Sequence, residues 1–341
     1  MDSFQNKFST GIVIKLTRNI VTNISLAILH PLPFFCIVSR PNKDLMAEAI
    51  NLEQIKRWTI IALASDDFLM QTLVLKGGSA IDILHPRDEG KLSRTSFDID
   101  FSIETDFDKD FEEITSRIER AIKDTFAEKE LIVFDYKFSQ KPKTMSEELK
   151  DFWGGYYIEL KLITADEYKR LGGNLEKMRR GAISVRPNQS SKVEIEISKY
   201  EYVGDKMETK VEGHTIYIYS PQMIIFEKLR AICQQLPAYA DIIPSHSPRP
   251  RARDFYDIHL ICEQHDIEAD SPASKELVRL IFEAKKVPLS FIKDISDNTE
   301  IHRQDWQNVL DTLPSLERAE VEGFDYYLSF VVEKFQSLTS L

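Results

Sequence analysis

The stretch Thr72-Leu73-Val74-Leu75-Lys76-Gly77-Gly78-Ser79-Ala80 decides the fold, together with Phe97-Asp98-Ile99-Asp100-Phe101-Ser102-Ile103, which follows it in the chain. Residues 72–76 are a short apolar run rich in β-formers, which predicts a buried strand that stops at the glycine pair. Residues 79–84 have helical character. Residues 97–103 alternate between apolar and polar side chains, and this period of two predicts a second, half-buried strand.

The segment Gly77-Gly78-Ser79 therefore joins a strand to a helix. Backbone N–H groups and the helix dipole at such a junction favour an anion such as phosphate. Two glycines between a strand and a helix can also be nothing more than a tight turn. This segment alone does not separate the two interpretations.

Asp98 and Asp100 occupy positions i and i+2 of the second strand, so their carboxylates point to the same face. Adjacent carboxylates repel each other unless a cation lies between them. Mg²⁺ prefers carboxylate and phosphate oxygens and seldom needs a cage made only of protein ligands. The alternative is an edge strand on which both aspartates face solvent.

The rest of the chain divides into two parts. Helices are expected at 51–69 and 111–129, strands at 131–138, 156–163 and 193–198, and a loop or short helix at 169–186. Beyond Tyr219 the pattern becomes helical, with Ser220 as an N-cap and Pro221 at the first helical position. We therefore predict an α+β fold with domains at 46–210 and 211–341, in which a mixed sheet with flanking helices is followed by a helical bundle.

Composition limits the classes of function. The chain has 341 residues, with 44 Lys and Arg against 55 Asp and Glu, giving a net charge of −11. This balance argues against a long electropositive groove for a nucleic-acid duplex. Cys36, Cys233 and Cys262 are scattered and have no CxxC spacing, so neither a disulfide framework nor a zinc site is indicated. A reducing cytoplasm is the expected location.

The first 45 residues stand apart from the motifs. Residues 19–39 carry no charged side chain, but Pro31 and Pro33 interrupt the run and argue against one continuous membrane-spanning helix. Met46 precedes the amphipathic pattern that leads into the first strand, so residues 1–45 are interpreted as an N-terminal extension and Met46 as an alternative start. We expect no stable membrane association.

Two ordered signatures resemble a known family. Lys76-Gly77-Gly78-Ser79-Ala80 followed by Arg94-Thr95-Ser96-Phe97-Asp98-Ile99-Asp100-Phe101 is similar to the signature of the AbiEii/AbiGii-type toxins, in the DNA polymerase β-like nucleotidyltransferase superfamily. Phe226-Glu227-Lys228-Leu229-Arg230-Ala231 and Arg253-Asp254-Phe255-Tyr256-Asp257-Ile258 resemble the Lys-containing helix and the RDxxD motif of that family. The resemblance covers residues 46–262.

The resemblance implies a role for each matching residue. Asp98, Asp100 and a third carboxylate would hold Mg²⁺, as two ions, and Asp254 would join them as a catalytic residue. Gly77, Gly78, Ser79 and Lys228 would bind the triphosphate, while Arg253 and Asp257 would support Asp254. Glu194 and Glu196 share one face of their strand, and the family pattern favours Glu196 as the third carboxylate, although both could simply face solvent.

The implied reaction transfers a nucleoside monophosphate from a nucleoside triphosphate to an acceptor hydroxyl. A tRNA-like RNA 3′ end is the favoured acceptor, contacted by Lys177, Arg179 and Arg180 or by Arg249, Arg251 and Arg253. The implied role is the toxin of a toxin–antitoxin or abortive-infection system, with a cognate antitoxin as a partner. The alternatives are a small-molecule nucleotidyltransferase of the antibiotic-modifying type and a nucleotide-binding module without turnover.

Overall fold

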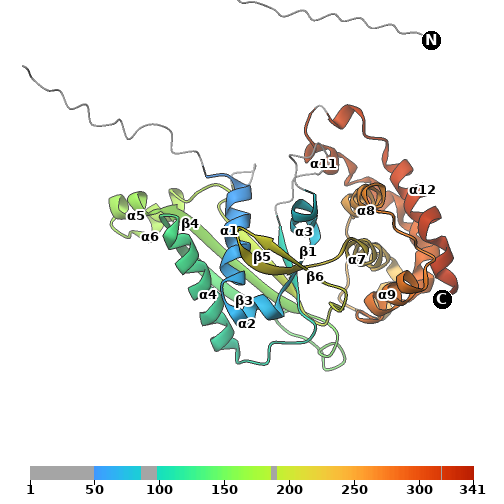
Figure 1. Ribbon diagram of the computed structural model, residues 1–341, viewed down its shortest axis with the longest axis horizontal. Coiled ribbons are helices and arrows are strands. Elements are labelled where there is room, and N and C mark those ends of the chain that lie inside the picture. The colour runs from blue at the N-terminus through green and yellow to red at the C-terminus, as the bar shows by residue number, and fades with distance from the viewer. Residues whose placement is uncertain (1–49, 86–97, 186–189, 316) are drawn as a thin grey trace, which may run out of the picture. The chain divides into compact units, whose positions relative to one another are not determined.

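A mixed β-sheet is the centre of the protein (Figure 1). The computed structural model describes residues 50–85, 98–185, 190–315 and 317–341, and within them seven strands form the sheet in the order β3-β4-β5-β2-β1-β7-β6. The β2–β5 and β1–β7 pairs are parallel, and the other neighbouring pairs are antiparallel. The strands are β1 Val74–Lys76, β2 Ile99–Ser102, β3 Leu131–Lys141, β4 Gly155–Thr164, β5 Val193–Ser198, β6 Met207–Val211 and β7 His214–Ile218.

Three helices lie together on one side of the sheet: α1 Leu52–Ala64, α2 Asp67–Thr72 and α4 Phe111–Glu128 (Figure 1). The expectation of a single helix over 51–69 is wrong, because the helix is interrupted between α1 and α2. Ser65 ends α1, and the Asp66 side chain accepts a hydrogen bond from the backbone N–H of Leu69 to cap α2. A side chain that can cap a new helix competes with continuation of the old one.

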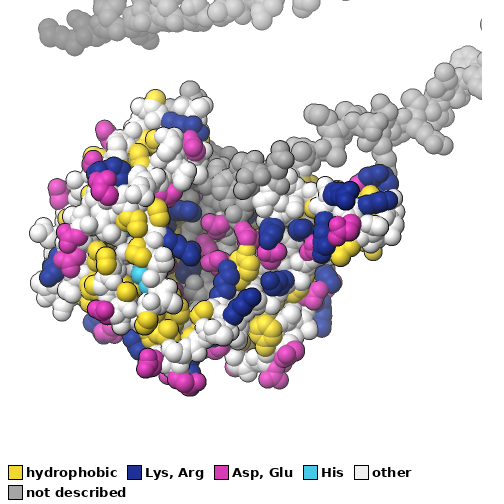
Figure 2. Space-filling model, turned by 180° about the vertical axis from the view of Figure 1, so that it is seen from behind, with side chains coloured by type: hydrophobic (Ala, Val, Ile, Leu, Met, Phe, Trp, Pro, Cys, Tyr) yellow, Lys and Arg dark blue, Asp and Glu magenta, His cyan; other side chains and the backbone are white. Residues whose placement is uncertain are grey.

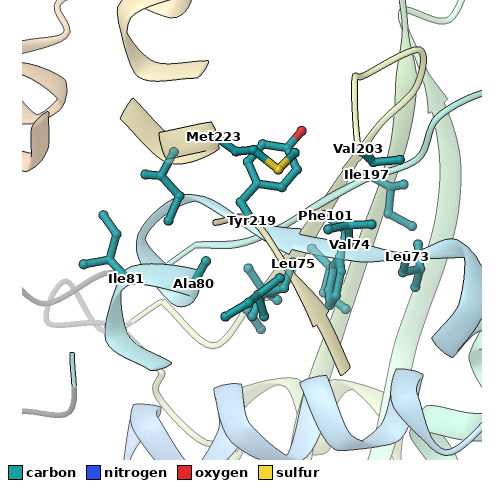
Figure 3. Close-up of a cluster of buried hydrophobic side chains, with 14 of the residues drawn as sticks. Leu73, Val74, Leu75, Ala80, Ile81, Phe101, Ile197, Val203, Tyr219 and Met223 are labelled. Atoms are coloured by element: carbon teal, nitrogen blue, oxygen red, sulfur yellow. The ribbon is translucent and has the colours of Figure 1, made fainter. Parts of the chain in front are cut away.

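The central strands are anchored by a buried apolar cluster (Figure 3). Leu73, Val74 and Leu75 are almost fully buried, as is Phe101 on the neighbouring strand. Phe101 packs near Ile60 and Leu63 of α1. Because strand side chains alternate, the same packing turns Asp100 toward the opposite face of the sheet.

The chain beyond the sheet is helical, as the sequence predicts. The elements are α7 Pro221–Cys233, α8 Ala252–Gln264, α9 Pro272–Glu283, α10 Thr299–Arg303, α11 Trp306–Asp311 and α12 Phe324–Phe335, with 3₁₀ segments between and after them. The Ser220 hydroxyl accepts from the N–H of Met223, and Pro221 begins α7, which confirms the predicted cap. Within the described residues, no helix has the length and apolar character needed to cross a membrane.

Several details differ from the sequence expectations. The β6–β7 hairpin was not expected; it spans the expected boundary at 210/211, and β7 pairs with β1, so the sheet continues to Ile218. The stretch 169–186 contains the end of α5 Ala165–Leu171 and all of α6 Leu175–Arg180. The extension 1–45, the apolar segment 19–39 and the motif residues 94–97 lie outside the described residues. Cys233 and Cys262 are free thiols.

Candidate active site

A cleft of about 910 Å³ lies on the polar face of the central strands. Its lining includes Gly77 and Gly78 at the start of α3 Gly77–Leu84, the carboxylates of β2 and β5, and side chains of α7 and α8. The predicted site residues on this lining are Gly77, Gly78, Asp98, Asp100, Glu196, Lys228, Arg253 and Asp254. The space-filling view from behind shows acidic and basic side chains along a hollow in that face (Figure 2).

One row of side chains crosses four strands at this cleft. The strand register pairs Lys76 with Asp100, Asp100 with Glu196, and Glu196 with Tyr157. Paired positions point to the same face of a sheet and lie about 5 Å apart. The row therefore begins with a cation, continues with two adjacent carboxylates and ends with an aromatic ring.

The electrostatics of Asp100 are unfavourable. The pKa of Asp100 is raised to about 7: burial is the largest cause, Lys76 opposes it, and the neighbouring carboxylates of Asp98, Glu196 and Glu227 add to it. Asp100 is therefore a carboxylate that gains from an added cation at neutral pH.

Two long basic side chains, Arg253 and Lys141, already contact the carboxylates of Asp98 and Glu196. Arg253 places Nη1 3.6 Å from Oδ2 of Asp98, and Lys141 places Nζ 3.5 Å from Oε1 of Glu196. All four of these side chains are close to half exposed, so both pairs are weak in solvent. The sequence placed Arg253 as a support for Asp254 and did not single out Lys141.

A glycine is required at position 77 because the Asp100 side chain approaches its backbone closely. Gly77 has φ +63°, and a Cβ at this position would lie 2.6 Å from Oδ2 of Asp100. The helix that begins there has no side-chain cap among the described residues. The first N–H groups of a helix have no partner within it and can bind an anion. Ser79 is different: it is buried, it does not line the cleft, and its hydroxyl donates to the backbone oxygen of Asp98 at 2.8 Å.

Lys228 lies between two buried aspartates of α8. Its ammonium is 2.8 Å from Oδ1 of Asp254 and 2.9 Å from Oδ2 of Asp257, and all three residues are at most 4% exposed. Burial alone would raise the pKa of Asp254, but the charges of Lys228 and Arg251 outweigh it and hold that pKa below the usual value. Asp254 and Asp257 therefore lie on the same face of α8, with Lys228 as their common partner.

A buried ion cluster on the cleft lining was missed by sequence reasoning. Arg230 donates through both terminal nitrogens to Glu201, at 2.7 and 3.3 Å. Lys76 and Lys285 lie 3.6 and 3.7 Å from the same carboxylate, and Lys76 also reaches Glu227 at 3.4 Å. The signal was present for part of it, because Lys76, Glu227 and Arg230 stand inside the two quoted signatures. Glu201 and Lys285 stand outside them.

The donor set fits a magnesium ion. Within the described parts of the chain, no group of three or more His, Cys, Asp or Glu side chains is arranged to hold a metal by itself. Mg²⁺ is commonly bound by one or two carboxylates together with water and substrate phosphates, so such a cage is not required. Asp100 and Glu196 are adjacent in register, and the neighbouring carboxylates add to the effect of burial in raising the pKa of Asp100. These residues offer the hard oxygen ligands that the ion prefers.

The two basic groups named from the sequence have different positions. Arg249, Arg251 and Arg253 line the cleft. The backbone N–H of Arg251 donates to Nδ1 of His302 at 3.1 Å. Arg179 on α6 is instead held by both oxygens of Asp135, and Lys177 and Arg180 are not part of the cleft lining. The arginines at 249–253 are therefore the basic group next to the candidate site.

A phosphate-type turn, adjacent carboxylates and a helical part that contributes Lys228 and Asp254 to the cleft are features of the nucleotidyltransferase class. Residues 60–330 match the family model described as "Nucleotidyl transferase AbiEii toxin, Type IV TA system". The chain belongs to this family, and it is a nucleotidyltransferase. The resemblance stated from the two signatures is thereby confirmed.

A solved structure, an antigenic nucleotidyltransferase-like protein from Paracoccidioides brasiliensis, is 15% identical, and the match covers 68% of this chain and 92% of that one. Its TM-score is 0.33, which is too low to carry an argument. No curated protein matches this chain.

Proposed function

We propose that this enzyme transfers a nucleoside monophosphate from a nucleoside triphosphate to the 3′ hydroxyl of an RNA, in the presence of Mg²⁺. The observation that carries the proposal is the placement of Asp98, Asp100 and Glu196 in one cleft with the glycine turn and Lys228. Asp98, Asp100 and Glu196 would hold Mg²⁺. When bound, Mg²⁺ would polarise the α-phosphate and lower the pKa of the attacking hydroxyl.

The residues of the chain would hold the leaving group in place. The uncapped N–H groups at Gly77 and Gly78 would bind phosphate oxygens of the triphosphate, and Lys228 would supply a positive charge to them. Lys228 is held by Asp254 and Asp257, so these aspartates would aim the ammonium and keep it charged. Ser79 would act indirectly, because its hydroxyl holds the backbone of Asp98.

The basic residues next to the site favour an anionic acceptor. Arg249, Arg251 and Arg253 lie on the cleft lining of a chain whose net charge is −11. A local basic group in an acidic protein supports contact with a single RNA end rather than with a long duplex. We further propose that residues 46–210 and 211–341 form the two walls, since the carboxylates come from the first part and Lys228 and Asp254 from the second.

The biological role we propose follows from the family. Its description names a type IV toxin–antitoxin system. The enzyme would act as the toxin in the cytoplasm, and a cognate antitoxin would be its genetic partner. A small-molecule acceptor of the antibiotic type is the competing possibility.

The test is incubation of the full chain with Mg²⁺, total cellular RNA and each of the four α-labelled nucleoside triphosphates. Label that enters RNA, depends on Mg²⁺ and is lost in Asp100→Asn supports the proposal. If label enters only small molecules, the acceptor is a small molecule and not RNA. Triphosphate binding without any transfer would favour a module without turnover.

A further inference from the structure

The end of the carboxylate row contains an aromatic ring and a cation that the proposed reaction has not used. Tyr157 follows Glu196 in the register, and it lies two strands from Asp100, a distance of about 10 Å. Lys141, the last residue of β3, places Nζ 3.4 Å from the centre of the Tyr157 ring. Both residues line the cleft.

The Tyr157 ring is held in place from two sides. Its hydroxyl donates to Glu194 of the neighbouring strand. Its face carries the ammonium of Lys141, which also lies 3.5 Å from Glu196 and is 54% exposed. The ring is therefore fixed, while the cation above it is free to move when another charge or a planar group enters the cleft.

The location suits the acceptor rather than the triphosphate. The glycine turn and Lys228 are on the β1 and α7 side of the carboxylates, whereas Tyr157 and Lys141 are on the β4 and β3 side. In a phosphoryl displacement the attacking oxygen and the leaving oxygen lie on opposite sides of the phosphorus. The acceptor hydroxyl must then approach from the side of Tyr157.

We infer that Tyr157 and Lys141 form the acceptor subsite, and that the 3′-terminal nucleotide of a single-stranded RNA end occupies it. The base stacks on the Tyr157 ring, since single-stranded nucleic acids are commonly bound by stacking on aromatic side chains. Lys141 leaves the ring and Glu196 and binds the phosphate on the 5′ side of that nucleotide. Glu194 keeps the ring in position. This inference rests on the proposed function.

The chain offers a matched control. Lys137 is on the same strand and, by the register, on the same face as Lys141, and it is exposed but does not line the cleft. Lys137→Ala removes the same charge from the same strand without touching the subsite.

The experiment measures KM for two substrates with the full chain and Mg²⁺. The acceptor is a single-stranded RNA octanucleotide with a free 3′ hydroxyl, and the donor is the triphosphate found by labelling. Stacking of one base implies that Tyr157→Leu raises the KM for RNA by about 5-fold to 100-fold. Lys141→Ala should raise it by at least about 5-fold, and both should leave the KM for the triphosphate within about twofold. Tyr157→Phe and Lys141→Arg, which keep the ring and the charge, should raise the KM for RNA less than Tyr157→Leu and Lys141→Ala. Lys137→Ala should stay close to wild type.

The possible outcomes separate a failure of the acceptor subsite from a failure of the proposed function. An unchanged KM for RNA in Tyr157→Leu and Lys141→Ala would overturn the subsite and leave the proposed function standing. Equal increases in the KM for RNA and for the triphosphate would also overturn it, because the subsite would then serve the donor. A wild-type enzyme that labels only small molecules, or nothing, would overturn both the subsite and the RNA acceptor.

Discussion

Glu196 on β5 is the register partner of Asp100 on the parallel strand β2. The two carboxylates therefore stand side by side on the polar face of the sheet, where burial and mutual repulsion raise the pKa of Asp100 to about 7. A fold that only had to be stable would gain by removing one of these charges. Two such carboxylates next to a phosphate-type turn are what a cation-dependent site needs.

Asp100→Asn should abolish transfer without loss of stability. The amide keeps the shape of the carboxylate and removes a buried charge, so the melting temperature should stay unchanged or rise. Turnover should fall by at least about 100-fold, the size of effect seen when one group that stabilises transition-state charge is removed. Turnover at saturating Mg²⁺ and a thermal melt without metal check both parts. Activity within a few-fold of wild type would show that Asp100 is not a metal ligand.

Glu196 and Glu194 form a matched pair for the third carboxylate. Glu196 is the register partner of Asp100, whereas Glu194 accepts a hydrogen bond from Tyr157. Glu196→Gln should lower turnover by at least about 10-fold and raise the Mg²⁺ concentration needed for half-maximal activity, while Glu194→Gln should leave that concentration unchanged. Magnesium titrations of the two variants measure this. The reverse order would move the assignment to Glu194.

Lys228→Ala should cost both stability and nucleotide affinity. Removing the ammonium leaves Asp254 and Asp257 buried without their shared cation, which typically costs about 3–5 kcal/mol. Lys228→Arg keeps the charge, so it should fold with less loss, yet bind the triphosphate more weakly because its planar fork replaces a point charge. Urea unfolding and calorimetry with a non-hydrolysable triphosphate separate the two effects. Wild-type affinity in a folded Lys228→Arg would favour a structural role alone.

Glu201→Gln should destabilise the protein by about 3 kcal/mol, because Arg230, Lys76 and Lys285 would lose their common counter-charge. Burial alone would raise the pKa of Glu201, but the three cations outweigh it and hold that pKa well below 4.5. Since the folded pKa is depressed, this stabilisation is present above about pH 4.5 and is lost as the pH falls toward the folded value. Urea unfolding at pH 7 tests the loss, with the exposed Glu208→Gln as the control.

His302 should make the stability sensitive to mild acid. Its pKa is lowered from 6.5 to about 4: burial is the largest cause, the charge of Asp254 opposes it, and Arg251 adds to it. Between pH 6.5 and 4 the unfolded chain therefore binds a proton at His302 that the folded chain does not. The free energy of unfolding decreases as the pH falls through that window, by about 3 kcal/mol at most.

His302→Asn provides the comparison, since its amide oxygen can accept the N–H of Arg251 without titrating. Denaturation at pH 7 and pH 5 should show a smaller loss for this variant than for wild type. Equal losses in the two proteins would remove His302 from the explanation.

The sequence by itself determined many of the local elements and identified the residues of the two family signatures. Period-two alternation at 97–103 and 193–198 puts the carboxylates on one strand face, whatever surrounds them. Ser220 and Pro221 begin a helix because the hydroxyl caps the N–H of Met223 and proline needs no donor at that position. Short-range chemistry of this kind acts within a few residues, so it can be read from the order of the amino acids.

Only the tertiary structure decided which of these residues meet. The register of β2 with β5 selects Glu196 as the neighbour of Asp100, and the packing of α7 on α8 encloses Lys228 between two aspartates. The Glu201–Arg230–Lys285 cluster joins positions that are far apart in the chain, so no local sequence pattern could predict it. The physical reason is that register and burial depend on contacts made across the whole fold, and these set the pKa of Asp100 and the position of Tyr157.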